Sequence, residues 1–137
     1  MDKEFISYEQ ALALKELGFN EPCMAIYYSK DKSFSWHHHK DHTNDESALD
    51  SGKFNISAPL YQQAFRWFRN KYHIYAEISI LNISKEQGVD CELIIKPLSD
   101  KNGIAEYYKI LGVFEYDVAE QISLNELIEI VKNKKTN

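Results

Sequence analysis

The chain has few of the residues that cross-link or interrupt a fold. Its two cysteines, Cys23 and Cys91, lie in apolar runs and lack the spacing of a zinc or redox motif. With only five glycines, the chain has no Gly-rich phosphate loop. The charged start, Met1 to Phe5, is unlike a signal peptide, and no apolar run reaches membrane-spanning length. We therefore expect a cytoplasmic protein with buried thiols and no membrane partner.

A strong charge of either sign is also absent. The net charge is −5 and the acidic residues are scattered, which argues against a surface that coats nucleic acid. No aromatic and basic pattern matches an RNA-recognition motif. The length of 137 residues fits one domain, 1–137, whose core is large enough to need no structural metal. We expect no cofactor.

The first helix has clear start and stop signals. Ser7 and Gln10 have the spacing of a capping box at a helix N-terminus. Gly18 stands where a helix ends in a left-handed residue, and Phe19 can pack back on Leu14. These signals predict a helix from Tyr8 to Leu17.

The remaining elements follow from hydrophobic periodicity and turn residues. Strands are predicted at 23–28, 33–39, 74–83, 89–98 and 107–114, and helices at 59–72 and from Asp117, an N-cap with Glu120 at the capping-box position. The polar segment 41–55 is predicted to be a flexible loop, and 134–137 a frayed tail.

Short turns between consecutive strands favour antiparallel pairing. The sequence therefore predicts an α+β class, a two-layer domain with one antiparallel sheet of about five strands packed by three helices, in the order α-β-β-α-β-β-β-α.

The polar face of the helix at 59–72 is the main candidate site. Gln62, Arg66, Arg69 and His73 are separated by four, three and four residues, which predicts that their side chains lie along one line. Two guanidinium groups with an amide and an imidazole can hold a phosphate, a nucleotide or a carboxylate.

Two tyrosines near this helix, Tyr61 and Tyr75, can stack on the base of a nucleotide. The alternative is that both arginines lie flat on the surface and pair with acidic residues such as Glu77 or Glu120.

The segment from Trp36 to His42 suggests a metal site. His37 and His39 would share a face in a strand, and His38 and His42 would share one in a helical turn. Either pair, together with Asp41, can bind a transition metal. A metal-dependent hydrolase is therefore one alternative function. The cluster lacks the distant second half of a usual metal site and starts the predicted loop, so we favour a solvated loop edge. No other catalytic pattern is present, and we expect a protein that is not an enzyme.

Three segments carry a resemblance to a known group of proteins. They are SYEQALALKELGFNEPC at 7–23, APLYQQAFRWFR at 58–69 and Leu127 to Lys132. Together they resemble a family of small uncharacterised proteins from phages and mobile elements of Bacteroidetes, whereas residues 29–55 match nothing in it. The resemblance implies a phage accessory protein in the cytoplasm of a bacterial host, of the kind that inhibits a host defence.

The resulting hypothesis is a non-enzymatic binding protein. Its partner would be a host protein or a small anionic ligand such as a nucleotide, and nucleic acid is not expected. A homodimeric interaction module, joined through an open sheet edge, is a further alternative.

Overall fold

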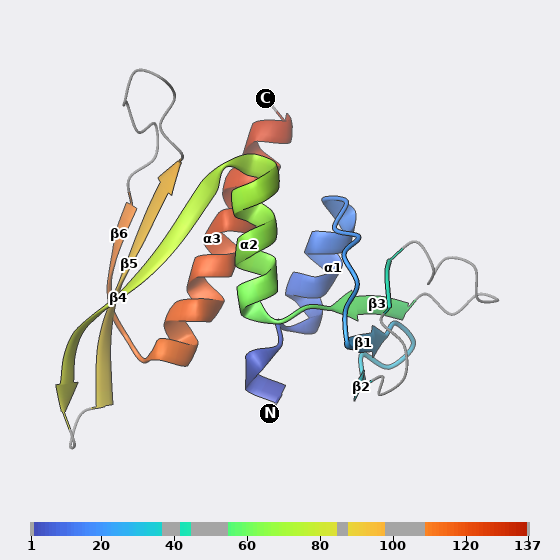
Figure 1. Ribbon diagram of the computed structural model, residues 1–137, viewed down its shortest axis with the longest axis horizontal. Coiled ribbons are helices and arrows are strands. Elements are labelled where there is room, and N and C mark those ends of the chain that lie inside the picture. Colours follow the sequence, from blue (N-terminus) through green and yellow to red (C-terminus); the bar gives the residue numbers. More distant parts are fainter. Residues whose placement is uncertain (1, 37–41, 45–54, 85–87, 98–108, 137) are drawn as a thin grey trace. The chain divides into compact units, whose positions relative to one another are not determined.

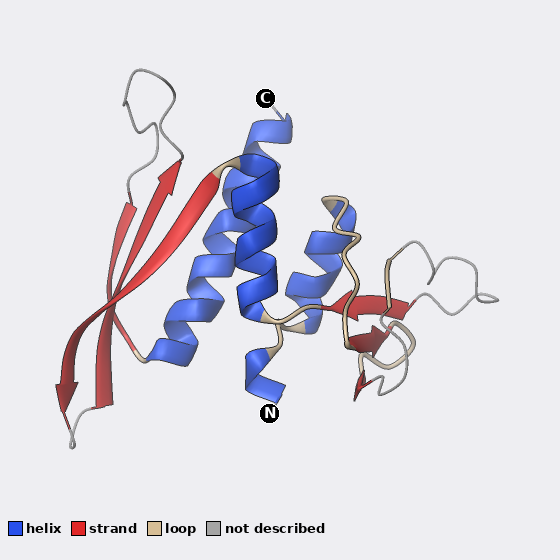
Figure 2. Cartoon of the chain, in the orientation of Figure 1, coloured by secondary structure: helices blue, strands red, loops and turns tan. Residues whose placement is uncertain are grey.

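A computed structural model describes residues 2–36, 42–44, 55–84, 88–97 and 109–136 (Figure 1). The chain divides into two compact units, Met1–Tyr61 and Gln62–Asn137, and each is described by itself. The described residues form three α-helices and two antiparallel sheets, so the α+β class is confirmed (Figure 2). That residues 1–137 form a single domain stays a prediction.

The prediction of a single sheet is wrong, because the described strands form two sheets of three strands each, β2-β1-β3 and β4-β5-β6. The sheet of the first unit contains β1 (Ala25–Tyr28), β2 (Phe34–Trp36) and β3 (Asn55–Ala58). β1 pairs antiparallel with both neighbours, and its pairing with β2 confirms the antiparallel pairing predicted for the strands at 23–28 and 33–39. Most of the predicted loop at 41–55 lies outside the described residues.

The strand that the sequence did not predict, β3, is held by hydrogen bonds to residues elsewhere in the first unit. The backbone N–H of Ser57 donates to Oδ1 of Asn44 at 3.0 Å, and its hydroxyl donates to the carbonyl of His42 at 3.2 Å. Ser57 is therefore a buried strand residue. The helix that follows, α2 (Tyr61–Tyr72), begins after Pro59 instead of at it.

The first helix, α1 (Tyr8–Glu16), has the predicted ends. The N–H of Gln10 donates to the Ser7 hydroxyl at 3.2 Å, and the N–H of Ser7 donates to Oε1 of Gln10 at 3.0 Å. At the other end Gly18 is left-handed, with φ of 93°, and the N–H of Phe19 donates to the carbonyl of Leu14 at 2.9 Å. The capping box and the Schellman ending are both confirmed.

Removing the N-cap should therefore destabilise the protein. We expect Ser7→Ala to lower the free energy of unfolding by about 1 kcal/mol, because the N–H of Gln10 loses its acceptor. Urea denaturation measures the change. Ser29→Ala, which removes a hydroxyl outside any helix, is the matched control, and an equal loss in both variants would contradict the assignment.

The second unit is a meander with a helix on it. β4 (Ile74–Ser84), β5 (Gly88–Pro97) and β6 (Lys109–Phe114) pair antiparallel in sequence order, as predicted. α3 (Tyr116–Thr136) packs against β4 and β5 (Figure 1). Buried side chains alternate along β5 at Cys91, Leu93 and Ile95, so they face this helix.

Both ends of α3 differ from the prediction. The helix begins at Tyr116, so Asp117 lies in its first turn rather than at the N-cap, where a carboxylate still favours the helix dipole. The helix continues to Thr136, so most of the segment expected to fray is helical. Within the described ranges, none of the helices combines the length and the apolar character that crossing a membrane requires.

Candidate functional site

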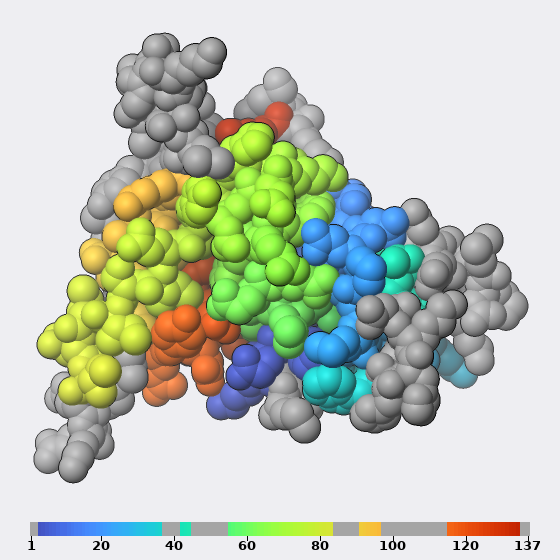
Figure 3. Space-filling view, viewed as in Figure 1, coloured from blue at the N-terminus to red at the C-terminus, as the bar shows by residue number. Residues whose placement is uncertain are grey.

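α2 presents one polar and one buried side, as its sequence predicts. Ala64, Phe65 and Phe68 are buried, whereas Gln62 and Arg66 are exposed and Arg69 is half-buried. The exposed side forms part of the surface in Figure 3, where α2 is green. The spacing of Gln62, Arg66 and Arg69 places them on this side.

The end of α2 brings Arg69 and Tyr75 together. The helix ends at Tyr72, and His73 is left-handed with φ of 57°, its N–H donating to the carbonyl of Arg69 at 3.2 Å. His73 therefore lies past the helix and does not continue the predicted line of side chains. β4 begins at the next residue, and the guanidinium carbon of Arg69 lies 5.9 Å from the centroid of the Tyr75 ring. This distance is within the range of a cation–π contact.

The register of β4 with β5 places a further cation, Lys96, beside Tyr75. Tyr75 lies directly opposite Lys96 on β5, and Glu77 lies opposite Ile94. Residues paired in this way share one face of the sheet, and it is the face opposite to the buried side chains of β5. The ammonium group of Lys96 lies 3.3 Å from a carboxylate oxygen of Glu77. The sequence did not indicate Lys96, because only strand register places it beside Tyr75.

We name these five residues the Arg69–Tyr75 site: Arg66, Arg69, His73, Tyr75 and Lys96. Its rings and cations are at least partly accessible, and Tyr75 is 40% exposed. In the part of the chain that the structure describes, Arg66 and Arg69 form no ion pair, and Glu77 pairs with Lys96 instead. The two guanidinium groups can therefore bind an added anion without breaking an existing salt bridge.

Tyr61 does not belong to this site. Its side chain is only 4% exposed, and its hydroxyl donates to Oε1 of Gln10 at 3.0 Å within the first unit. Since the ring is buried and the hydroxyl is bonded, Tyr61 cannot stack on a ligand without breaking the packing of this unit. Of the two candidate tyrosines, Tyr75 has the exposed ring.

Of the candidate metal ligands, only His42 lies in the described residues; the others, His37, His38, His39 and Asp41, lie outside them. His42 pairs with Cys23 in an isolated bridge, where each backbone N–H donates to the other carbonyl at 2.8 Å. The described ranges contain no group of three histidine, cysteine or acidic side chains that could hold a metal ion. His42 therefore has a clear structural role, in positioning the segment that holds β3.

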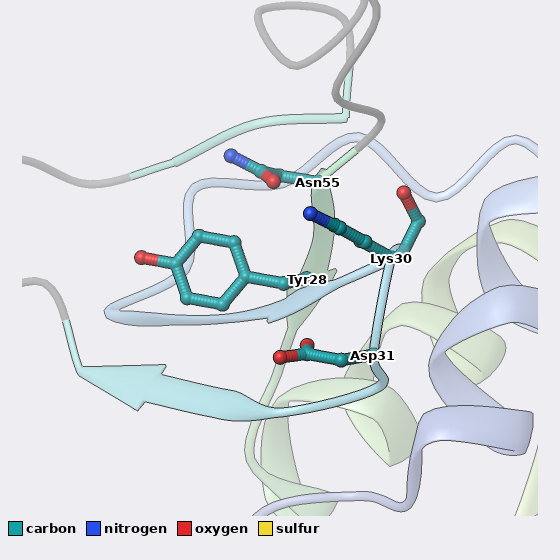
Figure 4. A pocket seen from close by; sticks show the side chains of 5 residues that line it. Tyr28, Lys30, Asp31 and Asn55 are labelled. Atoms are coloured by element: carbon teal, nitrogen blue, oxygen red, sulfur yellow. The ribbon is translucent and has the colours of Figure 1, made fainter.

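The first unit has a small pocket of about 210 Å³ that the sequence did not suggest. Tyr28, Ser29, Lys30, Asp31 and Asn55 line it (Figure 4). The Ser33 hydroxyl and backbone N–H donate to Oδ1 of Asp31 at 2.6 and 3.0 Å, and these bonds hold the pKa of Asp31 below its usual value. Because the Asp31 carboxylate already accepts both of these hydrogen bonds, the pocket has fewer polar groups available to bind a ligand than the Arg69–Tyr75 site has.

Comparisons of the chain with protein-family models, with curated proteins and with solved structures find no match.

Proposed function

We propose that this chain is a non-enzymatic binding protein that holds a small anionic ligand, a nucleotide, at the Arg69–Tyr75 site. The observation that supports this most is the Arg69 guanidinium over the exposed Tyr75 ring, with Lys96 opposite that ring on β5. A nucleotide combines the two features that such a site recognises, phosphate charge and an aromatic face.

The two parts of a nucleotide would have separate partners. Arg66 and Arg69 would donate hydrogen bonds to phosphate oxygens, because a guanidinium presents its N–H groups as a planar fork. Arg69 lies over the Tyr75 ring, so the base would stack on the accessible remainder of that ring. Beside these cations, the carboxylate of Glu77 pairs with the ammonium group of Lys96 at 3.3 Å, and this ion pair supports a role in binding rather than as a general base.

The resemblance to proteins of Bacteroidetes phages and mobile elements supplies the biological setting of the proposal. In the cytoplasm of a bacterial host, an accessory protein of this kind would sequester a signalling nucleotide and so act against a host defence. Inhibition by binding a host protein is the second form of this proposal, and it would use the same cationic surface.

Isothermal titration calorimetry with ADP, GDP, a cyclic dinucleotide and the uncharged nucleosides tests the proposal. We expect at least one nucleotide to bind and the nucleosides not to bind. Tyr75→Ala should weaken binding by about 1–3 kcal/mol, or roughly 5-fold to 150-fold, because the stacking surface is lost. Tyr75→Phe should retain most of the affinity.

Tyr28→Ala is the matched control, since it removes an exposed tyrosine that lines the pocket of the first unit. A loss of affinity in this variant alone would place binding at the pocket and contradict the proposed site. Absence of binding by every nucleotide tested would contradict the ligand class.

A further inference from the structure

β4 is a long edge strand. In the order β4-β5-β6 it pairs with β5 on one side, and no strand of the described residues pairs with its other side. The unpaired side of an edge strand presents a row of backbone N–H and C=O groups that can pair with another strand. The eleven residues from Ile74 to Ser84 make this edge longer than a typical strand.

This edge has few of the features that prevent natural edge strands from pairing with strands of other molecules. β4 contains one charged residue, Glu77, and no lysine or proline. A bulge lies between Ile80 and Asn82, and it interrupts the register with β5, but the strand continues beyond it to Ser84. The sequence of β4 is thus close to that of a strand paired on both sides.

Three large aliphatic side chains of β4 are exposed at and beyond the bulge. Ile80 and Leu81 are each 52% exposed, and Ile83 is 77% exposed. β4 lies at the visible surface in Figure 3, where it is yellow-green. Clustered exposed aliphatic residues next to an open backbone edge are typical of an interaction surface rather than of a solvated strand.

We infer that β4 pairs edge to edge and antiparallel with β4 of a second copy of this chain. A second copy fits this edge because β4 carries only one charge, Glu77, so two β4 strands can pair with little charge repulsion although the net charge of the chain is −5. Because Glu77 is its only charge, like charges lie opposite each other in just one antiparallel register, the one centred on Glu77.

Such a pairing is isologous, so it closes as a twofold dimer and joins two three-stranded sheets into one of six strands. The ligand site uses a face of the sheet, whereas the dimer uses the backbone edge. Failure of nucleotide binding would therefore leave the dimer unaffected, and the reverse also holds.

Sedimentation velocity of the full chain over a wide concentration range tests the inference. We expect a dimer that dissociates on dilution. Leu81→Lys and Ile83→Lys should each give a monomer with an unchanged far-UV circular dichroism spectrum, because a lysine on the edge opposes pairing. Leu12→Lys, which changes an exposed leucine of α1, should leave the dimer intact.

Hydrogen exchange of the unsubstituted chain provides a measurement that depends on no variant. Amides of β4 should exchange more slowly at concentrations where the dimer forms than at concentrations where it dissociates. A monomer at every concentration, or a dimer that persists in both β4 lysine variants, would overturn the inference.

Discussion

The double variant Arg66→Ala, Arg69→Ala should lose nucleotide binding while keeping its fold. Hydrogen bonds to charged groups contribute about 1.5–3 kcal/mol each, so losing one from each arginine should weaken affinity by roughly a hundredfold or more. Stability should change little, because neither side chain forms an ion pair in the described ranges and the contact of Arg69 with Tyr75 is worth about 1 kcal/mol or less. Calorimetric titration and thermal unfolding measure the two effects.

The matched control is Lys30→Ala, Lys32→Ala, which removes two positive charges from the first unit. If attraction to any positive surface caused the binding, both double variants would weaken it equally. We expect the lysine variant to bind normally. Retained binding in the arginine variant would exclude the Arg69–Tyr75 site.

The variant Leu93→Ala should cause the largest loss of stability. Leu93 is fully buried on the middle strand of the second sheet, on the face that α3 covers. Replacing a buried leucine with alanine removes transfer free energy and leaves a cavity, at a cost of about 2–5 kcal/mol. Chemical denaturation followed by circular dichroism measures the change in the free energy of unfolding.

The neighbouring residue on the opposite face provides the control. Ile94 is half-buried and follows Leu93 directly on β5, so its side chain points away from α3. Ile94→Ala should cost about 1 kcal/mol. If the two variants lost equal stability, the assignment of the covered face would be wrong.

Features that depend on neighbouring residues could be predicted from the sequence. The N-terminus of α1 is capped by Ser7 and Gln10, which are three residues apart, and the left-handed Gly18 terminates the helix at its other end. Each of these residues acts on the adjacent turn of the helix, so residue types at fixed spacing identify both ends. The meander of the second unit has short connections between alternating strands, and it too is as predicted.

Features that depend on distant residues could not be predicted. β3 is held by Asn44 and His42, whose bonds to Ser57 span 13 and 15 residues. The four residues of β3, Asn55–Ala58, are too few to show a strand pattern by themselves. The division into two sheets has the same cause, because strand order is a property of pairing between distant segments.

The candidate site also has one part that the sequence predicted and another part that it did not. Arg69 and Tyr75 are six residues apart, and the sequence placed both near one helix end. Lys96 enters only through the register of β4 with β5. Tyr61 is not part of the site because its hydroxyl donates to Gln10, which lies 51 residues away in the sequence.

The most direct test of the proposed site is an NMR titration of the ¹⁵N-labelled chain with the nucleotides named above. We predict that the largest shift changes fall on Arg66 to Glu77 and around Lys96, because these residues surround the Arg69–Tyr75 contact. Shift changes confined to the pocket around Tyr28 and Asn55, or none with any nucleotide, would contradict the account.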